Sequence, residues 1–448
     1  MTALKAGKNR DGVTICNLGG GAAKNNAGKE AVMKMARIVG AACMASSVAL
    51  LTAPAMAAGI ARVSFGQTAQ TIEGFGGSDA WMPQMSTAES DALFANNNNN
   101  QMGLSILRVR IDPGGQFNWG TELYNAKAAI ARGARIMATP WTPPASMKSN
   151  GSTIMGSLNT SSYAAFASYL QSYVTYMSNG GAPLYAISLQ NEPDANVTYE
   201  SCVWTAAQID TWVAAYGGSL GTKLIIPESQ NFLIALSDTT LNDSNAVSNV
   251  GIIAEHLYIG AYPSVKNVTP VYYANAFAHG KEVWETEHFI STNGITSAMY
   301  LAREISDSMA IGNYSAYLYW WVNDAAVDAY SDGLIDANNN IKPHGYMMAQ
   351  WSKFVRPGYA RAITTYSPTS NVYITAFVGG GHYVIVALNQ GTAQVNQPFM
   401  LSGGTVTSLT PYQTSGANLS MTTLDTIPVS NNMFNYTLPA QSVTTFVQ

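Results

Sequence analysis

Two glutamates stand where strand-like segments end, in contexts that suit a pair of catalytic carboxyl groups. Glu192 lies in Gln190-Asn191-Glu192-Pro193, and Glu287 closes Trp284-Glu285-Thr286-Glu287. Two carboxyl groups about 5 to 5.5 Å apart are the minimum machinery for retaining glycoside hydrolysis, in which one attacks the anomeric carbon and the other protonates the leaving oxygen. The charge of one ionised carboxylate favours the protonated form of its neighbour, so such a pair separates into a nucleophile and an acid.

The segments that must position these glutamates alternate between strand-like and helix-like patterns. Short runs rich in β-branched and aromatic residues predict eight strands, at 71–76, 104–111, 134–139, 184–190, 223–227, 251–257, 282–287 and 314–320. Helical patterns fall between them, at 87–95, 161–177, 205–216 and 297–309, with a last one near 344–354. Eight strand–helix units over roughly 290 residues are typical of a (β/α)8 barrel, whose function sits at the carboxyl ends of its strands.

The pattern changes after residue 357. Period-2 stretches at 371–377, 382–389, 404–409 and 442–447, separated by Gly, Ser, Thr and Asn, predict an antiparallel β-sandwich of about 90 residues. The predicted fold is therefore α/β, a (β/α)8 barrel with an associated antiparallel β-sandwich side domain. We expect a leader at 1–57, a first strand at 58–70 that joins the sandwich, the barrel at 71–357 and the sandwich at 358–448.

Composition and charge exclude several classes of protein. Hydrophobic residues make up 47% of the 448 residues and charged ones 11%, so the chain is not intrinsically disordered. The formal charge is -4 overall, and without the first 57 residues, which hold seven basic and two acidic groups, it becomes -9. A surface of that sign repels phosphate backbones and anionic membranes, so we expect no nucleic-acid partner and no membrane association of the processed chain.

The first 57 residues have the features of an export signal. Lys34 and Arg37 precede an uncharged run at 38–51, and Ala55-Met56-Ala57 supplies the small residues that a signal peptidase reads. The run is shorter than the ~20 residues of a membrane-spanning helix. We expect cleavage after Ala57 and a secreted protein, extracellular or periplasmic.

Seven motifs occur in the order seen in glycoside hydrolase family 30, and the chain most resembles its bacterial glucuronoxylanase/xylanase subfamily, subfamily 8. The resemblance covers essentially all of the chain beyond the leader. The motifs are Gly74-Phe75-Gly76-Gly77, Arg108-Val109-Arg110-Ile111-Asp112-Pro113, Ala138-Thr139-Pro140-Trp141-Thr142-Pro143-Pro144, Gln190-Asn191-Glu192-Pro193-Asp194, His256-Leu257-Tyr258, Trp284-Glu285-Thr286-Glu287-His288 and Phe354-Val355-Arg356-Pro357-Gly358.

The resemblance implies a role for each polar residue at the strand ends. It makes Glu192 the acid/base and Glu287 the nucleophile, with Arg108 supporting the nucleophile and Asn191 donating to the 2-hydroxyl of the sugar. Glu285 is a rival nucleophile, but on a strand its side chain would lie about 6.5 Å deeper than that of Glu287.

The resemblance also implies aromatic contacts with the substrate. Trp141, Tyr258 and Trp321 match positions where the family stacks aromatic faces on sugar rings, and Tyr199 matches a residue on the leaving-group side. The substrates implied are xylan and xylooligosaccharides, cleaved by a monomer that needs no cofactor.

One departure from the subfamily concerns the loop after Trp321. Its typical members carry an arginine there that holds the carboxylate of a methylglucuronic acid branch. This chain has no arginine between Trp321 and Arg356, and carries Asp324, Asp328 and Asp332. We therefore expect a xylanase that does not depend on such branches. The alternatives are a glucuronoxylan-specific endoxylanase, an exo-acting xylobiohydrolase, and a β-1,6-galactanase or β-glucosidase-like specificity.

Other kinds of function receive less support. Gly217-Gly218-Ser219-Leu220-Gly221 satisfies the G-x-S-x-G pattern of serine hydrolases, but it follows a helix pattern and precedes a strand, which is the reverse of a nucleophile elbow. The five histidines show no metal-ligand spacing, so we expect no metal site. A catalytically inactive carbohydrate-binding protein on the same scaffold is the alternative of a different class.

Overall fold

The computed structural model describes residues 58–260, 265–292, 294–324 and 333–448. The predicted leader, 1–57, and most of the loop after Trp321 lie outside these residues. Among the helices in the described ranges, none has the length and apolar character that a membrane span requires.

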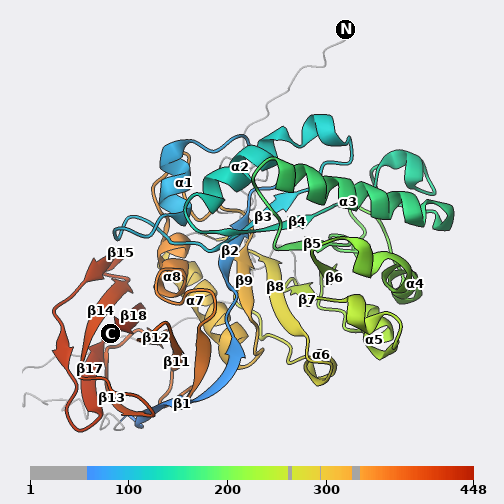
Figure 1. Cartoon of the computed structure of the whole chain (residues 1–448). Coiled ribbons are helices and arrows are strands. Elements are labelled where there is room, and N and C mark those ends of the chain that lie inside the picture. The colour runs from blue at the N-terminus through green and yellow to red at the C-terminus, as the bar shows by residue number, and fades with distance from the viewer. Residues whose placement is uncertain (1–57, 261–264, 293, 325–332) are drawn as a thin grey trace, which may run out of the picture. The chain divides into compact units, whose positions relative to one another are not determined.

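Eight parallel strands close into a barrel in the order of the chain, as predicted (Figure 1). Each follows the one before it in the sequence, and the last pairs with the first. Their bounds are β2 Gly74–Ser78, β3 Ile106–Arg110, β4 Arg135–Thr139, β5 Ala186–Ser188, β6 Lys223–Ser229, β7 Ile252–His256, β8 Glu282–His288 and β9 Ala316–Tyr319. Buried apolar side chains of seven of these strands, including Ile106, Met137 and Leu318, form a separate cluster in the barrel.

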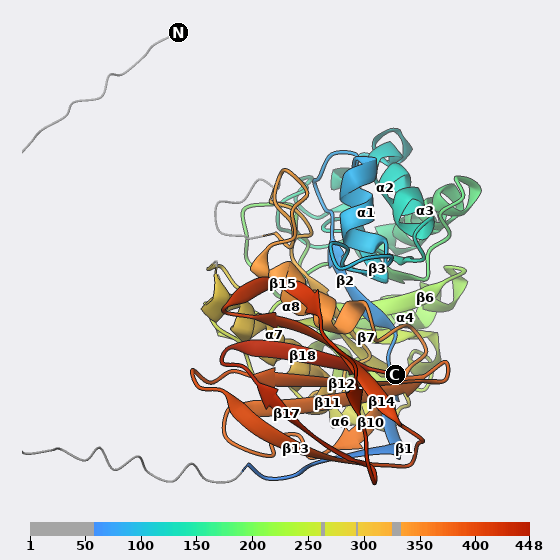
Figure 2. The ribbon, with the colours of Figure 1, turned by 90° about the vertical axis from the view of Figure 1, so that its left-hand side faces the viewer.

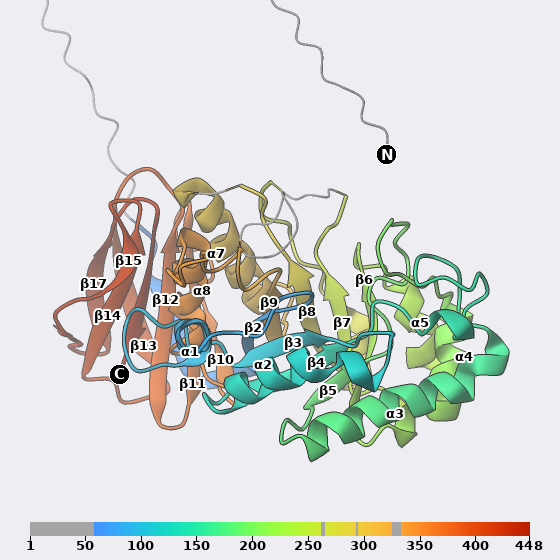
Figure 3. The same cartoon turned by 90° about the horizontal axis from the view of Figure 1, so that it is seen from above.

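Helices on the outside of the barrel connect the strands (Figure 3). The α-helices are α1 Thr87–Phe94, α2 Gly120–Ile130, α3 Tyr163–Asn179, α4 Ala206–Tyr216, α5 Ala235–Asn242, α6 Ala274–Ala278, α7 Ile295–Ala310 and α8 Pro343–Ser352. Short 3-10 helices are η1 Gln116–Asn118, η2 Ala145–Met147, η3 Thr160–Ser162, η4 Gly217–Ser219 and η5 Val247–Asn249.

Local chemistry explains where two helices begin. Ser86 and Glu89 form a capping box at the start of α1, and Thr205 and Gln208 form one at the start of α4. Each box satisfies two backbone N–H groups that a helix start leaves without partners. The G-x-S-x-G stretch falls on η4 between α4 and β6, so its serine stands after a helix and before a strand.

The second region is one continuous ten-stranded sheet that joins both ends of the described chain (Figure 2). Strand β1 pairs antiparallel with β10 and parallel with β13, so the sheet is mixed, whereas the sequence pattern indicated an antiparallel one. The sheet encloses a core in which Phe399 and Phe434 stack and Phe446 packs edge-on against both. Its strands are β1 Ala61–Thr71, β10 Ala360–Thr364, β11 Val372–Gly379, β12 His382–Asn389, β13 Val395–Ser402, β14 Ser408–Ser415, β15 Asn418–Thr423, β16 Ile427–Pro428, β17 Met433–Leu438 and β18 Ser442–Val447.

The parallel pair follows from the path of the chain. Strand β1 lies between β10 and β13 and leads directly into β2, the first barrel strand. The position of the barrel therefore fixes the direction of β1, and in that direction β1 runs parallel to β13. Period-2 patterning identifies a strand but carries no information about its direction.

Helices α7 and α8 pack between the barrel and this sheet. The indole of Trp351 on α8 donates to Thr375 Oγ1 at 3.3 Å, and the guanidinium of Arg303 on α7 lies 3.4 Å from the ring centroid of Tyr373. These contacts hold the sheet against the barrel wall, away from the strand ends that carry the glutamates.

Candidate active site

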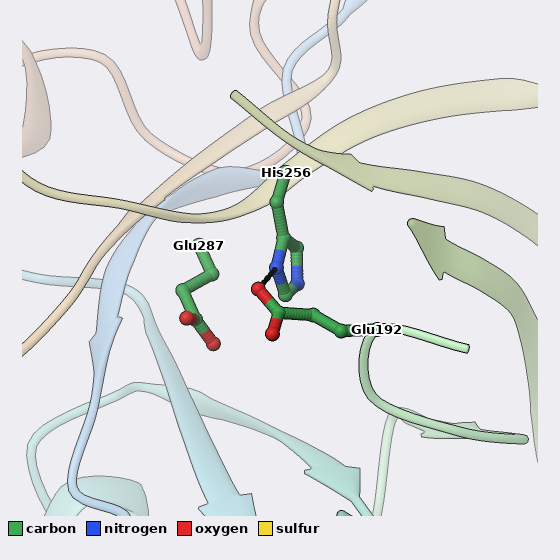
Figure 4. A group of neighbouring side chains, drawn as sticks. All are labelled: Glu192, His256 and Glu287. Carbon is green, nitrogen blue, oxygen red and sulfur yellow. Dashed lines mark hydrogen bonds and ion pairs between the residues drawn. The ribbon is translucent and has the colours of Figure 1, made fainter. Parts of the chain in front are cut away.

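The carboxyl ends of the barrel strands bring Glu192, His256 and Glu287 together (Figure 4). One carboxylate oxygen from each glutamate and a ring nitrogen of His256 all lie within 4.8 Å of one another. All three residues are buried, with exposed fractions of 6% or less. The two carboxyl groups therefore converge, with one oxygen of each close to the other, which fits the short separation of retaining glycosidases better than the wider one of inverting enzymes.

Irregularities in strand pairing produce this convergence. Between β7 and β8, Glu255 pairs with Glu285 and the next residue, His256, pairs with Glu287, so Thr286 is an extra residue on β8. Between β6 and β7, the register shift between Pro227 and Ser229 leaves Glu228 as the extra residue on β6. Bulges of this kind re-aim side chains at the rims of barrels.

The nucleophile candidate, Glu287, is held by two donors. Arg108 on β3 donates from Nη1 to Glu287 Oε2 at 2.5 Å, and the Tyr258 hydroxyl donates to Oε1 at 3.2 Å. Burial raises the pKa of Glu287, while His256 and Arg108 act against that shift. The two cations therefore favour the ionised form that a nucleophile needs.

Arg108 connects the nucleophile to the rest of the site. Its guanidinium is fully buried, donates from Nη2 to Asn191 Oδ1 at 2.6 Å, and forms an ion pair with Glu228 Oε1 at 3.2 Å. Burial alone would lower the pKa of Arg108, but Glu228 and Glu287 raise it. Because the amide oxygen of Asn191 is held in this way, its NH2 group is left as the donor, which suits the predicted bond to a sugar hydroxyl.

The acid/base candidate, Glu192, sits in the loop after β5 with a left-handed backbone, φ 46°. Such a conformation costs about 1–3 kcal/mol in a non-glycine residue and persists only where surrounding contacts impose it. Here the backbone N–H of Glu192 donates to the carbonyl of Glu228 at 2.9 Å. The Tyr199 hydroxyl and the Gln230 amide donate to Glu192 Oε2 at 2.9 and 3.2 Å.

His256 stands between two carboxylates. Its Nδ1 is 3.1 Å from Glu192 Oε1, and its Nε2 is 3.7 Å from Glu228 Oε1. Although burial favours the neutral ring, Glu287, Glu192 and Glu228 raise the pKa of His256 to about 10. A protonated imidazole is a donor at both ring nitrogens, which suits a place between two carboxylates.

The aromatic residues predicted to stack on sugar differ in their surroundings. Trp141 is 1% exposed, because the guanidinium of Arg108 lies 4.6 Å from its ring centroid and Trp81 packs 4.9 Å away. Trp321 is 6% exposed and packs on Trp320 at 4.1 Å. The stacking roles of Trp141 and Trp321 stay predictions, and Trp81, at 36%, is a more exposed residue than either.

The rival nucleophile, Glu285, lies in a different environment. It is fully buried, and its Oε2 accepts a hydrogen bond from the backbone N–H of Leu318 on β9. Burial and the nearby Glu304 raise the pKa of Glu285 well above its ordinary value. A neutral carboxyl group held by the barrel wall suits a structural role better than attack on a substrate.

Three residues of the site were missed by reasoning from the sequence: Glu228, Gln230 and Trp81. Glu228 and Gln230 come at and just after the end of β6, and Trp81 follows the end of β2 by three residues. The rule that strand ends carry the function would have found them, but the fifth predicted strand, 223–227, stopped at Pro227. His256 was recognised only as part of a motif and as a residue without metal-ligand spacing.

Comparison with known proteins agrees with this geometry. The family model for the glycosyl hydrolase family 30 TIM-barrel domain matches residues 97–333. The chain is 37% identical over 408 residues to glucuronoxylanase XynC of Bacillus subtilis (strain 168), covering 88% of this chain and 92% of that protein.

Solved structures give the same result for the fold. A glycoside hydrolase family 30 subfamily 8 xylanase, Xyn30A, from Clostridium acetobutylicum is 45% identical, with a TM-score of 0.79 over 87% of this chain and 99% of that one. A GH30 endoxylanase from Clostridium papyrosolvens C71 is 37% identical, with a TM-score of 0.77 over the same shares. The chain therefore belongs to glycosyl hydrolase family 30 and is a glycoside hydrolase.

Proposed function

We propose that this protein is a secreted endo-β-1,4-xylanase that cleaves xylan by retaining double displacement and does not depend on methylglucuronic acid branches. The observation that carries the proposal is the approach of the Glu192 and Glu287 carboxyl groups to within 4.8 Å, together with the names of its relatives, which include a glucuronoxylanase and two xylanases. Inverting enzymes hold their two carboxyl groups further apart to leave room for a water molecule, so this close approach favours direct attack by a carboxylate.

In the first step, Glu287 forms a bond to the anomeric carbon while the bond from that carbon to the leaving oxygen breaks. Glu192 gives its proton to that oxygen and becomes a carboxylate. In the second step, water attacks the same carbon and gives a proton to Glu192, and the electrons of the breaking ester bond return to Glu287. Arg108 and Tyr258 stabilise the Glu287 carboxylate that forms again in this step, because each donates a hydrogen bond to one of its oxygens.

The charges near Trp321 support independence from glucuronate branches. Lys342, a cation close to this loop, forms an ion pair with Asp324, with 2.7 Å between Nζ and Oδ2. Its positive charge is therefore already balanced by an acidic residue of the chain. Asp328 and Asp332 add negative charge to the same loop but fall outside the described residues. A carboxylate on a xylan branch gains nothing from such a surface.

Processing, oligomeric state and cofactor use complete the proposed function. We propose that the leader is removed after Ala57 on export and that the processed chain acts as a monomer. It uses no cofactor, because both chemical steps need only two carboxyl groups and water.

Product profiling of linear xylooligosaccharides, arabinoxylan and glucuronoxylan tests the specificity. We expect cleavage of all three, a mixture of product lengths, and a β-configured reducing end as the first product seen by NMR. Glu192→Gln serves as the inactive control. Products that all carry methylglucuronate at one fixed position, with linear substrates left intact, would refute the independence from branches.

Other outcomes identify the alternatives. Release of xylobiose alone indicates an exo-acting enzyme. An α-configured first product rejects the retaining mechanism. Binding to xylan without any new reducing ends indicates a carbohydrate-binding protein.

A further inference from the structure

A third buried carboxylate, Glu228, lies behind the two catalytic candidates. It is fully buried at the end of β6, with a left-handed backbone of φ 53°. Its Oε2 accepts a hydrogen bond from Thr139 Oγ1 at 3.0 Å, and its backbone carbonyl holds the N–H of Glu192. The double-displacement steps do not use Glu228, so its place in the site needs a separate explanation.

The arrangement of charges around Glu228 suggests one. Arg108 stands between Glu228 and Glu287, at 3.2 and 2.5 Å, and His256 stands between Glu228 and Glu192, at 3.7 and 3.1 Å. Glu228 therefore faces both cations, as Glu287 does, because His256 also lies within 4.8 Å of a Glu287 oxygen.

The geometry of His256 favours its charged form, because Nδ1 lies at hydrogen-bond distance from Glu192 and Nε2 lies 3.7 Å from Glu228, which is ion-pair distance but too long for a hydrogen bond. A neutral imidazole has one N–H donor and one nitrogen acceptor, so with a carboxylate on each side one nitrogen lone pair would point at a negative oxygen. Only the imidazolium donates from both nitrogens. The pKa of about 10 for His256 agrees with this geometry, and Glu228, whose pKa is lowered to about 2 by Arg108 and His256 despite its burial, stays an anion.

We propose that Glu228 is a positioning residue that keeps His256 protonated, and that through His256 it fixes which oxygen of Glu192 carries the transferable proton and how readily Glu192 recovers as a base. The inference rests on the proposed function. Because Oε1 faces the imidazolium, Oε2 is the oxygen left to carry the transferable proton, beside the Tyr199 hydroxyl and the Gln230 amide. After that proton is transferred, the imidazolium stabilises the Glu192 carboxylate until water is activated.

Charged and titratable groups pack around His256 from several strands, and the ring of Tyr258 also lies 6.2 Å from its own. Glu192 approaches from the loop after β5, Glu228 from β6, and Glu285 and Glu287 from β8, while Glu255 precedes His256 on its own strand. Arg108 on β3 completes the set through Glu287 and Glu228. Burial raises the pKa values of Glu255 and Glu285 well above the ordinary range, which favours their uncharged forms, whereas Glu228 is the ionised neighbour that no chemical step consumes.

The first experiment measures the charge of His256 without substrate. NMR of the full chain with 15N-labelled histidine follows the ring nitrogens from about pH 6 to about pH 10, with the His256 signals assigned from His256→Asn. We expect the wild-type ring to stay protonated over most of that range. In Glu228→Gln its midpoint should fall by roughly 1 to 3 pH units, because a neutral amide replaces its permanent counter-ion.

The second experiment measures the alkaline limb of kcat/KM on linear xylooligosaccharides. In Glu228→Gln the limb should move to lower pH by roughly 1 to 2 units, because the pair formed by His256 and Glu192 loses a proton sooner without the nearby anion. In the His256→Asn background the same substitution should leave the limb in place, since asparagine keeps a donor towards Glu192 but has no charge to regulate.

Controls separate positioning from folding. Glu255→Gln removes a buried carboxyl group from the strand of His256 and should change neither the His256 midpoint nor the alkaline limb, because that group is already neutral. Glu228→Asp keeps the charge but withdraws it from both cations, so it should give shifts of intermediate size and remains informative if Glu228→Gln unfolds.

An unchanged His256 midpoint in either Glu228 variant would overturn the proposal, and so would a loss of activity that is uniform across pH. If His256 behaves as expected but the wild-type enzyme does not cleave xylan, the proposed substrate is wrong and the role of Glu228 stands.

Discussion

Replacing Arg108 with methionine tests how the nucleophile is kept ionised. Methionine is unbranched and of similar reach, but it removes the donors to Glu287 at 2.5 Å and to Asn191 at 2.6 Å. A hydrogen bond to a charged group contributes about 1.5–3 kcal/mol, so two of them correspond to about 3–6 kcal/mol. At about 1.4 kcal/mol for each factor of ten, we expect kcat/KM to fall by roughly 10²- to 10⁴-fold.

Removal of Arg108 should also change how kcat/KM depends on pH. Arg108 acts against the rise in the pKa of Glu287 that burial causes, so its removal should raise that pKa further. Activity needs ionised Glu287 and is lost as pH falls through its pKa. The acid limb of kcat/KM should therefore move to higher pH, by roughly 1 to 3 units.

The assay is kcat/KM on a soluble xylooligosaccharide as a function of pH, with thermal unfolding to check the fold. Arg108→Met removes the positive charge that pairs with buried Glu228, and this loss should destabilise the protein by about 3–5 kcal/mol. Arg108→Lys retains a charge and should shift the limb less. Arg110→Met is the matched control, because Arg110 pairs with Glu200 and Asp112 instead of Glu287. A folded Arg108→Met variant with the wild-type acid limb would refute the reasoning.

Three further predictions concern the catalytic candidates, a residue that contacts one of them, and a buried aspartate elsewhere in the barrel. Glu192→Gln and Glu287→Gln should each lower kcat on xylan by roughly 10²- to 10⁴-fold with an unchanged circular dichroism spectrum, and near-normal turnover in either removes its catalytic assignment. Tyr199→Phe removes the hydroxyl that donates to Glu192 Oε2, so kcat should fall by about tenfold, which an unaltered kcat would contradict. Burial raises the pKa of Asp79 to about 8, so the folded state holds a proton that the unfolded state releases above about pH 4. Stability should therefore decline from about pH 4 to about pH 8, and Asp79→Asn should reduce that decline in chemical denaturation; an identical decline in the variant would count against it.

Much of the architecture could be predicted from the sequence because it depends on local patterns. Burial of both faces of a parallel strand requires short apolar runs, so the eight barrel strands were located to within a few residues from composition alone. Parallel strands in a barrel end at one rim, and for that reason Glu192 and Glu287, which are 95 positions apart, could be placed in one site.

Other features depend on contacts that no local pattern encodes. The parallel pairing of β1 with β13 arises because two distant segments meet in one sheet. The extra residues Glu228 and Thr286, which set His256 beside Glu287, reflect register between neighbouring strands that only the closed barrel determines.

The sequence by itself determined which carboxyl groups could react, since their positions at strand ends follow from the order of short apolar segments. Only the tertiary structure decided which groups control their charge. Arg108, His256 and Glu228 act through distances of 2.5 to 3.7 Å across different strands, and electrostatic interactions in a buried site depend on those distances and not on separation along the chain.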